Sequence, residues 1–326
     1  MQTDKEEETG MERRSTLKAV ALGLVLATLA GCGQSDKTGD RIAVSFHNMA
    51  EPFFVVMRRE LMAEAELQNV TVTVLDGQAN SAKQAADIEA ALVQGVDGVI
   101  LAPTDVNALA PAADTVLKAG LPIITVDRRV EGTSQPVPHV GADNVAGGGL
   151  MAEWVVKAYP QGARIVLLTG QPGSSSAIDR TKGVKNAIAA AGPSYTIVVE
   201  QSANWSRDQG LTVTQNVLTA LGAAKPDAIV AENDDMAFGA IEALRTAGIT
   251  GVAVLGFDAT PEALKMIKDG QMAVTIEQSP ARQIRSALQQ VLAAARTGAA
   301  LTPVSITPVL ITSANLNEAE RFDEMK

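Results

Sequence analysis

The chain alternates short runs of β-branched residues with longer stretches whose apolar residues recur at helical spacing. The first series runs from residue 42 to residue 127 and reads IAVSF, FFVVMRRELMAEAELQ, VTVTVLD, SAKQAADIEAALVQG, DGVILAP, NALAPAADTVLKAG and LPIITVD. Its strand-like runs are mostly apolar, as in sheets that are covered on both faces. The alternation predicts an α/β fold, in which a parallel sheet has its strands joined by crossover helices.

A second series of the same kind begins near Asp143. Its strand-like runs are ARIVLLTG, YTIVVEQ, DAIVAEND, VAVLGFD and MAVTIEQ, separated by helical stretches such as SRDQGLTVTQNVLTALG. Two consecutive series predict two similar lobes, each a parallel sheet with helices on both faces. The roughly 290 residues after residue 32 are enough for each lobe to bury its own core.

Polar residues follow most of the predicted strands. In open parallel sheets, ligands bind beyond the carboxyl ends of the strands, where several loops converge. Two lobes that face each other through such ends would form a ligand cleft. The polar residues at these ends are Asp76, Thr104, Asp105, Asp127, Arg128, Asn233, Asp234, Asp235, Asp258 and Gln278.

The charge balance and the scarcity of reactive residues argue against several classes of function. Thirty-seven acidic residues against 27 basic ones give a net charge of -10, with no window dense in Lys and Arg, so we expect no nucleic acid partner. The only histidines, His47 and His139, have no ligand-like spacing, which argues against a metal site. GSSSAIDR lacks the nucleophile elbow, and no phosphate-binding glycine motif follows a strand. We therefore expect binding without catalysis, with no catalytic residues and no cofactor.

The first 32 residues carry the pattern of a secretory signal peptide. Arg13, Arg14 and Lys18 precede the uncharged run AVALGLVLATLAG. This run has about a dozen residues, fewer than the roughly 20 that span a bilayer. LAGC resembles the lipobox of bacterial lipoproteins, so Cys32, the only cysteine, is the expected site of lipid attachment.

Two further features of this region leave the export route and the start site open. RRSTLK more weakly resembles a twin-arginine signal, since Thr16 stands where a Phe is usual. The preceding MQTDKEEETG is too acidic for a signal peptide, which favours translation from Met11. Residues 33–40 are interpreted as a linker.

From about Asp40 the sequence resembles the periplasmic sugar-binding proteins of ABC transporters, in the ribose-binding branch of the type I fold shared with the LacI repressor family. Seven segments carry this resemblance in the right order and spacing: EPFFVVMRREL, LAPTD, ITVDRRV, ADNVAGG, AENDDMAFGA, VLGFDATPEA and TIEQSP.

The resemblance implies a monomer in the periplasm or cell envelope, which captures a small ligand by lobe closure and delivers it to an ABC permease in the inner membrane. The expected N-terminal lobe comprises residues 41–142 and 279–306. The expected C-terminal lobe comprises residues 143–278 and 307–326. The glycine-rich GADNVAGGG between them is interpreted as a flexible connection with tight helix packing.

Carried over by motif position, the resemblance also implies ten ligand-binding residues. Phe53 and Phe54 on one side and Trp205 on the other would face a ring-shaped ligand, because the C–H faces of a sugar or cyclitol are apolar. The hydroxyl groups would be held by charged and amide side chains, and a ligand that lacks a hydroxyl would leave one unpaired. These residues are Glu51, Asp127, Arg128, Arg180, Asn233, Asp258 and Gln278.

Each of these residues also has a simpler interpretation. The aromatic side chains could belong to the core. Asp127 and Arg128 could form an ion pair at the end of a strand, and Asn233 could be a helix N-cap. Their occurrence at successive strand ends favours the binding site.

Two positions depart from the ribose-binding pattern and bear on the ligand. Glu51 stands where ribose binders usually carry Asn, which adds an acceptor and removes donors. Ala102 stands where another Asn is usual, which makes room. The stretches PVPHVGADNVAGG, MAEWVVKAYP and PVLITSANL are similar to myo-inositol-binding members of this branch. We therefore expect myo-inositol or a related cyclitol, with ribose or another aldose as the alternative.

Three other classes of protein remain as alternatives. A transcriptional repressor of this fold would carry a helix-turn-helix head, where this chain has a signal peptide. An enzyme would need an acid–base constellation that we do not find. A receptor for chemotaxis or a sensor kinase would have the same two lobes.

Overall fold

The computed structural model describes residues 40–325, which belong to one compact unit. The predicted signal peptide, Met11, Cys32 and nearly all of the linker lie outside the described residues. No helix within residues 40–325 is both long and apolar enough to cross a membrane.

The first lobe is built on a six-stranded sheet in which every pairing is parallel. Across the sheet, the strands are β11 (Val304–Ile306), β5 (His139–Ala142), β4 (Ile123–Val126), β3 (Gly98–Leu101), β1 (Arg41–Phe46) and β2 (Thr71–Asp76). β3 and β4 are buried along their whole length, as the apolar runs predict.

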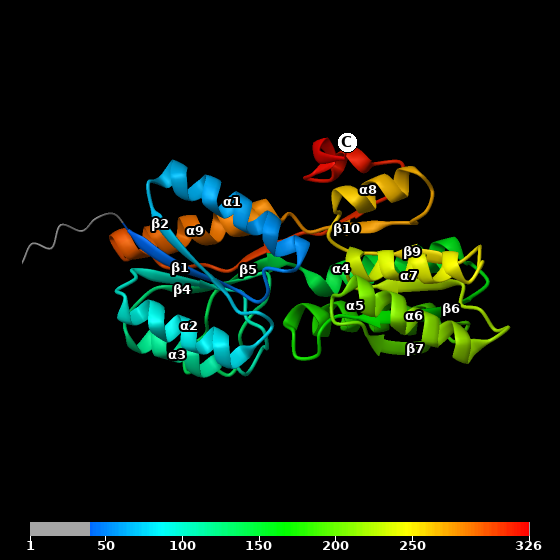
Figure 1. Ribbon diagram of the computed structural model, residues 1–326, viewed down its shortest axis with the longest axis horizontal. Helices are drawn as coiled ribbons and strands as arrows, with labels where there is room; N and C mark the ends of the chain where they lie inside the picture. Colours follow the sequence, from blue (N-terminus) through cyan, green and yellow to red (C-terminus); the bar gives the residue numbers. More distant parts are fainter. Residues whose placement is uncertain (1–39, 326) are drawn as a thin grey trace, which may run out of the picture. The chain divides into compact units, whose positions relative to one another are not determined.

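Two pairs of helices cover this sheet (Figure 1). α1 (Pro52–Gln68) and α9 (Pro280–Thr297) pack on one face with Ile42, Val44 and Phe46 of β1. α2 (Ser81–Val93) and α3 (Ala110–Lys118) pack on the other face. Successive residues of a strand point to opposite faces, so one sheet supports two cores.

The second lobe repeats this plan around a four-stranded parallel sheet. Its strands, in order, are β7 (Tyr195–Ser202), β6 (Ala163–Thr169), β8 (Ala228–Ala231) and β9 (Ala253–Leu255). α4 (Asn144–Ala158) and α5 (Ser175–Ala191) cover one face. The other face is covered by α6 (Arg207–Leu221), α7 (Asp234–Thr246) and α8 (Pro261–Lys268).

The C-terminal part of the chain connects the two lobes more than once. β10 (Thr275–Glu277) pairs antiparallel with β12 (Val309–Ile311), and a bridge between Leu255 and Val274 joins this pair to β9. Between β10 and β12, α9 and β11 pack with the first lobe. The chain therefore passes between the lobes after β5, after β10 and after β11. Two 3-10 turns, η1 (Leu316–Glu318) and η2 (Phe322–Glu324), follow β12.

The glycine-rich segment predicted to pack tightly forms the start of α4. A Cβ atom added at Gly148 would lie 2.2 Å from the carbonyl oxygen of Arg180, and one at Gly183 would lie 2.1 Å from that of Val145. Only glycine permits this approach of α4 to α5. The contact fixes the backbone of Arg180, a predicted ligand-binding residue.

Candidate functional site

A pocket lies where the strand ends of the two lobes meet. It holds about 340 Å³ of space not filled by atoms, part of which is open to solvent. Twelve residues line it: Glu51, Phe53, Phe54, Asp127, Arg128, Ser176, Arg180, Trp205, Asn233, Asp235, Asp258 and Gln278. All ten residues predicted from the sequence are among these twelve.

Both lobes supply the lining, and each side chain comes from a strand end or from the start of a helix. In the first lobe, Glu51, Phe53 and Phe54 lie at the start of α1, and Asp127 and Arg128 follow β4. In the second lobe, α5 supplies two residues, and the ends of β7, β8, β9 and β10 supply Trp205, Asn233, Asp258 and Gln278. This is the region beyond the carboxyl ends of the strands in which α/β sheets bind ligands.

Three lining residues adopt positive backbone φ angles, which side chains other than glycine rarely do. Asp127 has φ 61°, Trp205 has φ 62° and Asp258 has φ 114°. Such conformations cost about 1–3 kcal/mol each and persist only where the surroundings hold them. All three lie at this pocket, which indicates that the fold accepts a loss of local stability there in order to place these side chains.

Four charged side chains form the polar wall of the pocket. Asp127, Arg128, Arg180 and Asp258 are each at most 6% exposed. Burial raises the pKa of Asp127, which Arg128 and Arg180 oppose. Burial also raises the pKa of Asp258 well above its usual range, and Arg180 opposes this rise. Buried charged side chains make strong hydrogen bonds to hydroxyl groups.

The Arg180 side chain is held on every edge. Its Nε donates to Asn144 Oδ1 at 2.8 Å, and its Nη1 donates to the backbone oxygen of Glu232 at 2.5 Å. Its guanidinium carbon lies 3.6 Å from the centre of the Phe257 ring. Burial lowers the pKa of Arg180, which Asp258 and Asp127 oppose. Arg180 thus presents a fixed donor to the pocket.

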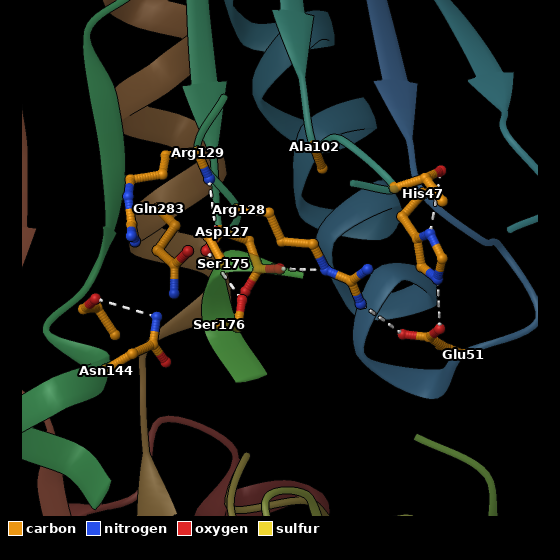
Figure 2. Close-up of polar contacts among 12 residues, drawn as sticks. His47, Glu51, Ala102, Asp127, Arg128, Arg129, Asn144, Ser175, Ser176 and Gln283 are labelled. Carbon is orange, nitrogen blue, oxygen red and sulfur yellow. Dashed lines mark hydrogen bonds and ion pairs between the residues drawn. The ribbon is translucent and has the colours of Figure 1, made fainter. Parts of the chain in front are cut away.

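Arg128 is held more loosely and lies between two aromatic rings. Its guanidinium carbon is 5.4 Å from the Phe54 ring centre and 5.5 Å from that of Trp205. Its Nη2 donates to Glu51 Oε2 at 3.4 Å, and its Nε lies 3.5 Å from Asp127 Oδ2 (Figure 2). Among the described residues, neither Nε nor Nη1 has a hydrogen-bond partner. A buried donor left over in this way suits a ligand hydroxyl.

The aromatic residues serve the core and the pocket together. Phe54 is fully buried with α1 and α9, and Trp205 belongs to the core of the second lobe. The Phe53 and Phe54 rings stand at 80° to each other. Only one of these two rings can therefore lie parallel to a given ligand face.

The two amide side chains are already engaged within the protein. Asn233 caps α7 by accepting from the backbone N–H of Met236 at 2.9 Å, and its Nδ2 donates to the backbone oxygen of Trp205 at 3.1 Å. Gln278 Nε2 donates to Asp258 Oδ1 at 2.5 Å. The simpler interpretation of Asn233 as an N-cap is therefore correct, and the residue lines the pocket as well.

Sequence reasoning missed two lining residues and gave weight to others that lie elsewhere. Ser176 of α5 lines the pocket and was not predicted at all; Asp235 of α7 also lines it and was among the polar strand-end residues but not among the ten predicted ligand-binding residues. Four strand-end residues are absent from the lining and bond within their own lobe: Asp76, Thr104, Asp105 and Asp234. Neighbouring residues at a strand end diverge, and a sequence does not reveal which one faces inward.

The described residues offer no arrangement for a metal ion. Among residues 40–325, no group of three or more His, Cys, Asp or Glu side chains is placed to hold one. The chemistry available to the pocket is hydrogen bonding and contact with apolar ring faces.

Comparison with known proteins defines the family. A family model described as a periplasmic binding protein domain matches residues 42–299. Over 273 residues the chain is 37% identical to the ribose import binding protein RbsB of Salmonella typhimurium, which covers 83% of this chain and 88% of that protein.

Two solved structures are also similar. The myo-inositol binding protein of Caulobacter, bound to myo-inositol, is 56% identical with a TM-score of 0.86, covering 87% of this chain and 97% of that one. A solute binding protein of Bacillus halodurans with bound myo-inositol is 31% identical with a TM-score of 0.82, covering 87% and 99%.

The fold and the pocket define a solute-binding protein of the type I class, and its relatives are solute-binding proteins and not enzymes. The chain belongs to the periplasmic binding protein family, among the sugar-binding receptors of ABC transporters. This family works in the periplasm.

Proposed function

We propose that this protein captures myo-inositol or a related cyclitol and delivers it to an ABC permease. The observation that carries the proposal is the pocket itself, in which buried carboxylates and guanidinium groups from both lobes surround a space of about 340 Å³. myo-Inositol carries a hydroxyl group on every ring carbon, so each charged group could meet a partner. The bound myo-inositol in the 56% identical Caulobacter protein supports the same ligand here.

One of the two departures from the ribose pattern favours a cyclitol. Glu51 lines the pocket beside Arg128, and a carboxylate there accepts hydrogen bonds without donating any. Ala102 is fully buried and does not line the pocket, so the room that the sequence predicted at this position does not bear on the ligand. A ligand with many hydroxyl donors satisfies such a site better than a pentose furanose.

Ribose or another aldose is the second candidate. The 37% identity to a ribose import binding protein favours it, because identity at that level and coverage is compatible with a shared ligand. The two candidates differ in the number of hydroxyl donors that they offer to Glu51.

Capture would proceed by closure of two lobes around the ligand. The proposed lobes comprise residues 41–142 with 279–306 and residues 143–278 with 307–326. Groups from both lobes already meet near the pocket: Val106 N–H donates to Gly173 O at 2.8 Å, and Arg129 N–H donates to Ser175 Oγ at 2.9 Å. A ligand that touches both lobes stabilises the closed state over an open one. We also propose that the protein is exported, that a lipid is attached at Cys32, and that the protein is a monomer.

A panel of ligands tests the proposal. The full chain, purified in mild detergent, would be heated in a thermal-shift assay with myo-inositol, other inositols, D-ribose, D-allose and D-glucose. A ligand at a hundred times its Kd stabilises the folded state by about 2.7 kcal/mol, enough to raise the midpoint measurably. We expect the largest shift with myo-inositol. A shift with D-ribose and none with myo-inositol would establish the second candidate instead.

A further inference from the structure

We propose that His47, which does not line the pocket, is a positioning residue that holds Glu51 as a fixed acceptor and thereby sets the ligand preference. The inference rests on the proposed function, because it concerns the selectivity of the same pocket. It is carried by a chain of hydrogen bonds that runs from the first lobe to the pocket wall (Figure 2).

The two oxygens of Glu51 have different partners. His47 Nε2 lies 3.0 Å from Oε1, and Arg128 Nη2 lies 3.4 Å from Oε2. His47 is 1% exposed, whereas the Glu51 side chain keeps 16% exposure at the pocket. The shorter contact is the one from behind the pocket, so His47 rather than Arg128 is the main restraint on the carboxylate plane.

His47 is itself fixed by groups that are all buried. Gln84 Nε2 donates to the backbone oxygen of Ala102 at 2.9 Å, and Gln84 Oε1 accepts from the backbone N–H of Thr104 at 2.9 Å. These backbone partners determine which end of the amide is oxygen. The Thr104 hydroxyl lies 2.9 Å from Gln84 Oε1 and 3.2 Å from His47 Nδ1. The imidazole ring is thus anchored through Nδ1 and free to act only through Nε2.

The proton arrangement follows from these partners. Burial and the charge of Arg128 lower the pKa of His47, while Glu51 and Asp76 raise it less, so the ring is neutral at pH 7. A neutral ring has one N–H. Because Nε2 faces a carboxylate, the proton belongs on Nε2. The Thr104 hydroxyl, which can donate to Gln84 Oε1, must then turn its single proton to Nδ1.

Protonation of the ring does not release Glu51. With both ring nitrogens protonated, Nδ1–H donates to the Thr104 hydroxyl, which turns its own proton to Gln84 Oε1. Nε2–H continues to face Glu51 in this state. The orientation of the carboxylate therefore does not depend on the charge of His47.

The backbone around these residues leaves little other freedom. Asp76 Oδ1 accepts from the backbone N–H of Met49 at 3.0 Å, and the His47 carbonyl oxygen accepts from Ala79 N–H at 2.9 Å. The segment from His47 to Glu51 is therefore tied to the loop after β2. What remains adjustable is the Glu51 side chain, and His47 removes that freedom.

A fixed carboxylate selects ligands by their donors. With one lone pair of each oxygen engaged by His47 or Arg128, the remaining lone pairs are available to a ligand hydroxyl in a fixed direction. A carboxylate free to rotate could instead turn to solvent or to Arg128 and would discriminate less. His47 therefore contributes to selectivity without touching the ligand.

Three substitutions at His47 separate positioning from folding. His47→Gln places an amide N–H near the position of Nε2 and can still donate to Glu51. His47→Asn places its amide near Nδ1, where it can bond Thr104 but cannot reach Glu51. His47→Leu removes both bonds. Each variant of the full chain, in mild detergent, would be titrated calorimetrically with myo-inositol and with D-ribose at pH 6 and pH 8, after its ligand-free melting temperature has been recorded.

We expect the Asn and Leu variants to bind myo-inositol at least about tenfold more weakly than the wild type, and the Gln variant to stay within about threefold. In a Glu51→Ala background, His47→Leu should change the affinity less than about twofold, because His47 acts on the ligand only through Glu51. The double-mutant cycle of these two substitutions isolates the coupling between the two side chains. If His47→Leu is too unstable to purify, His47→Asn replaces it in the double-mutant cycle with Glu51→Ala.

Undiminished binding by both the Asn and Leu variants, or an equal loss with and without Glu51, would overturn the inference while leaving the proposed function intact. Wild-type protein that binds neither probe would refute the proposed function, and the inference with it. The change in myo-inositol affinity between pH 6 and pH 8 should be the same, to within about threefold, in the wild type and in His47→Gln. Glu51 keeps a donor in both proteins, and both share the other buried carboxyl groups near the pocket, Asp127, Glu232 and Asp258; a larger difference would contradict the proton arrangement.

Discussion

The guanidinium group of Arg180 stacks on the ring of Phe257, with 3.6 Å between its central carbon and the ring centre. The same side chain donates to Asn144 and to the Glu232 carbonyl oxygen, so its plane is fixed before any ligand arrives. A donor that is already in place loses little entropy when a ligand binds.

This relationship predicts that Arg180→Lys weakens ligand binding at least tenfold, about 1.4 kcal/mol, although the charge is kept. An ammonium group cannot stack on Phe257 and also reach Asn144. Calorimetric titration measures the effect. Arg245→Lys is a matched control, because Arg245 is exposed and, within residues 40–325, pairs only with Glu242. Equal affinities of the Arg180→Lys variant and the control would contradict the role assigned to Arg180.

Asp127 offers a second test of the polar wall. Asp127→Asn replaces half of an acceptor-only group by donors, and Asn tolerates the left-handed backbone at this position. We expect at least about tenfold weaker binding, since the flanking arginines lose their counter-charge. The same substitution at the exposed Asp208 should have no effect on titration. Unchanged affinity in the Asp127 variant would mean that the ligand lies elsewhere.

The contact between α4 and α5 predicts opposite effects at adjacent glycines. Gly148→Ala would press against the Arg180 carbonyl and should lower the free energy of unfolding by about 1–3 kcal/mol. At Gly149 nothing lies within 4 Å of an added Cβ, so Gly149→Ala should raise it by about 0.5–1 kcal/mol. Urea denaturation measures both. The same sign for the two variants would argue against the close helix contact.

Glu232 gives the fold a specific pH dependence. Burial raises the pKa of Glu232 to about 7. Because the folded pKa lies above the usual value of 4.5, the stability that the protonated form supplies is complete below about pH 4.5 and is lost as pH rises to about 7. Glu232→Gln keeps a partner for Gly170 N–H and for Thr181 and cannot ionise.

We therefore expect the Gln variant to match the wild type near pH 5 and to exceed its stability at pH 8, by at most about 3 kcal/mol. Thermal denaturation across this range measures the difference, in which the contributions of other buried carboxyl groups cancel. A constant difference between the two proteins at every pH would contradict ionisation of Glu232 in the folded state.

The sequence predicted the general architecture because period-two and period-3.6 patterns are local. β1, for example, carries Ile42, Val44 and Phe46 to one core and Ala43 to the other, and its apolar run is visible without a structure. The convergence of Asp127 and Asp258 could also be anticipated, since both follow strands of parallel sheets.

The rest of the site depends on the directions in which individual side chains point, and the apolar and polar pattern of the sequence does not reveal these directions. Asp234 and Asp235 are adjacent, yet Asp234 turns to Thr260 and Thr275 while Asp235 lines the pocket. Both residues belong to the first turn of α7, where successive side chains point about 100° apart. His47 is a similar case, because a lone histidine after a strand gives no sign of its contact with Glu51 four residues later.

The central claim is that the strand-end side chains of two lobes enclose one polyhydroxylated ligand and leave it unchanged. Calorimetric titration of the purified full chain with myo-inositol, followed by chemical recovery of the ligand, tests this most directly. We predict saturation at one ligand per chain and recovery of unaltered myo-inositol. Absence of binding to myo-inositol and to every other sugar or cyclitol offered, or its conversion to a product, would contradict the claim.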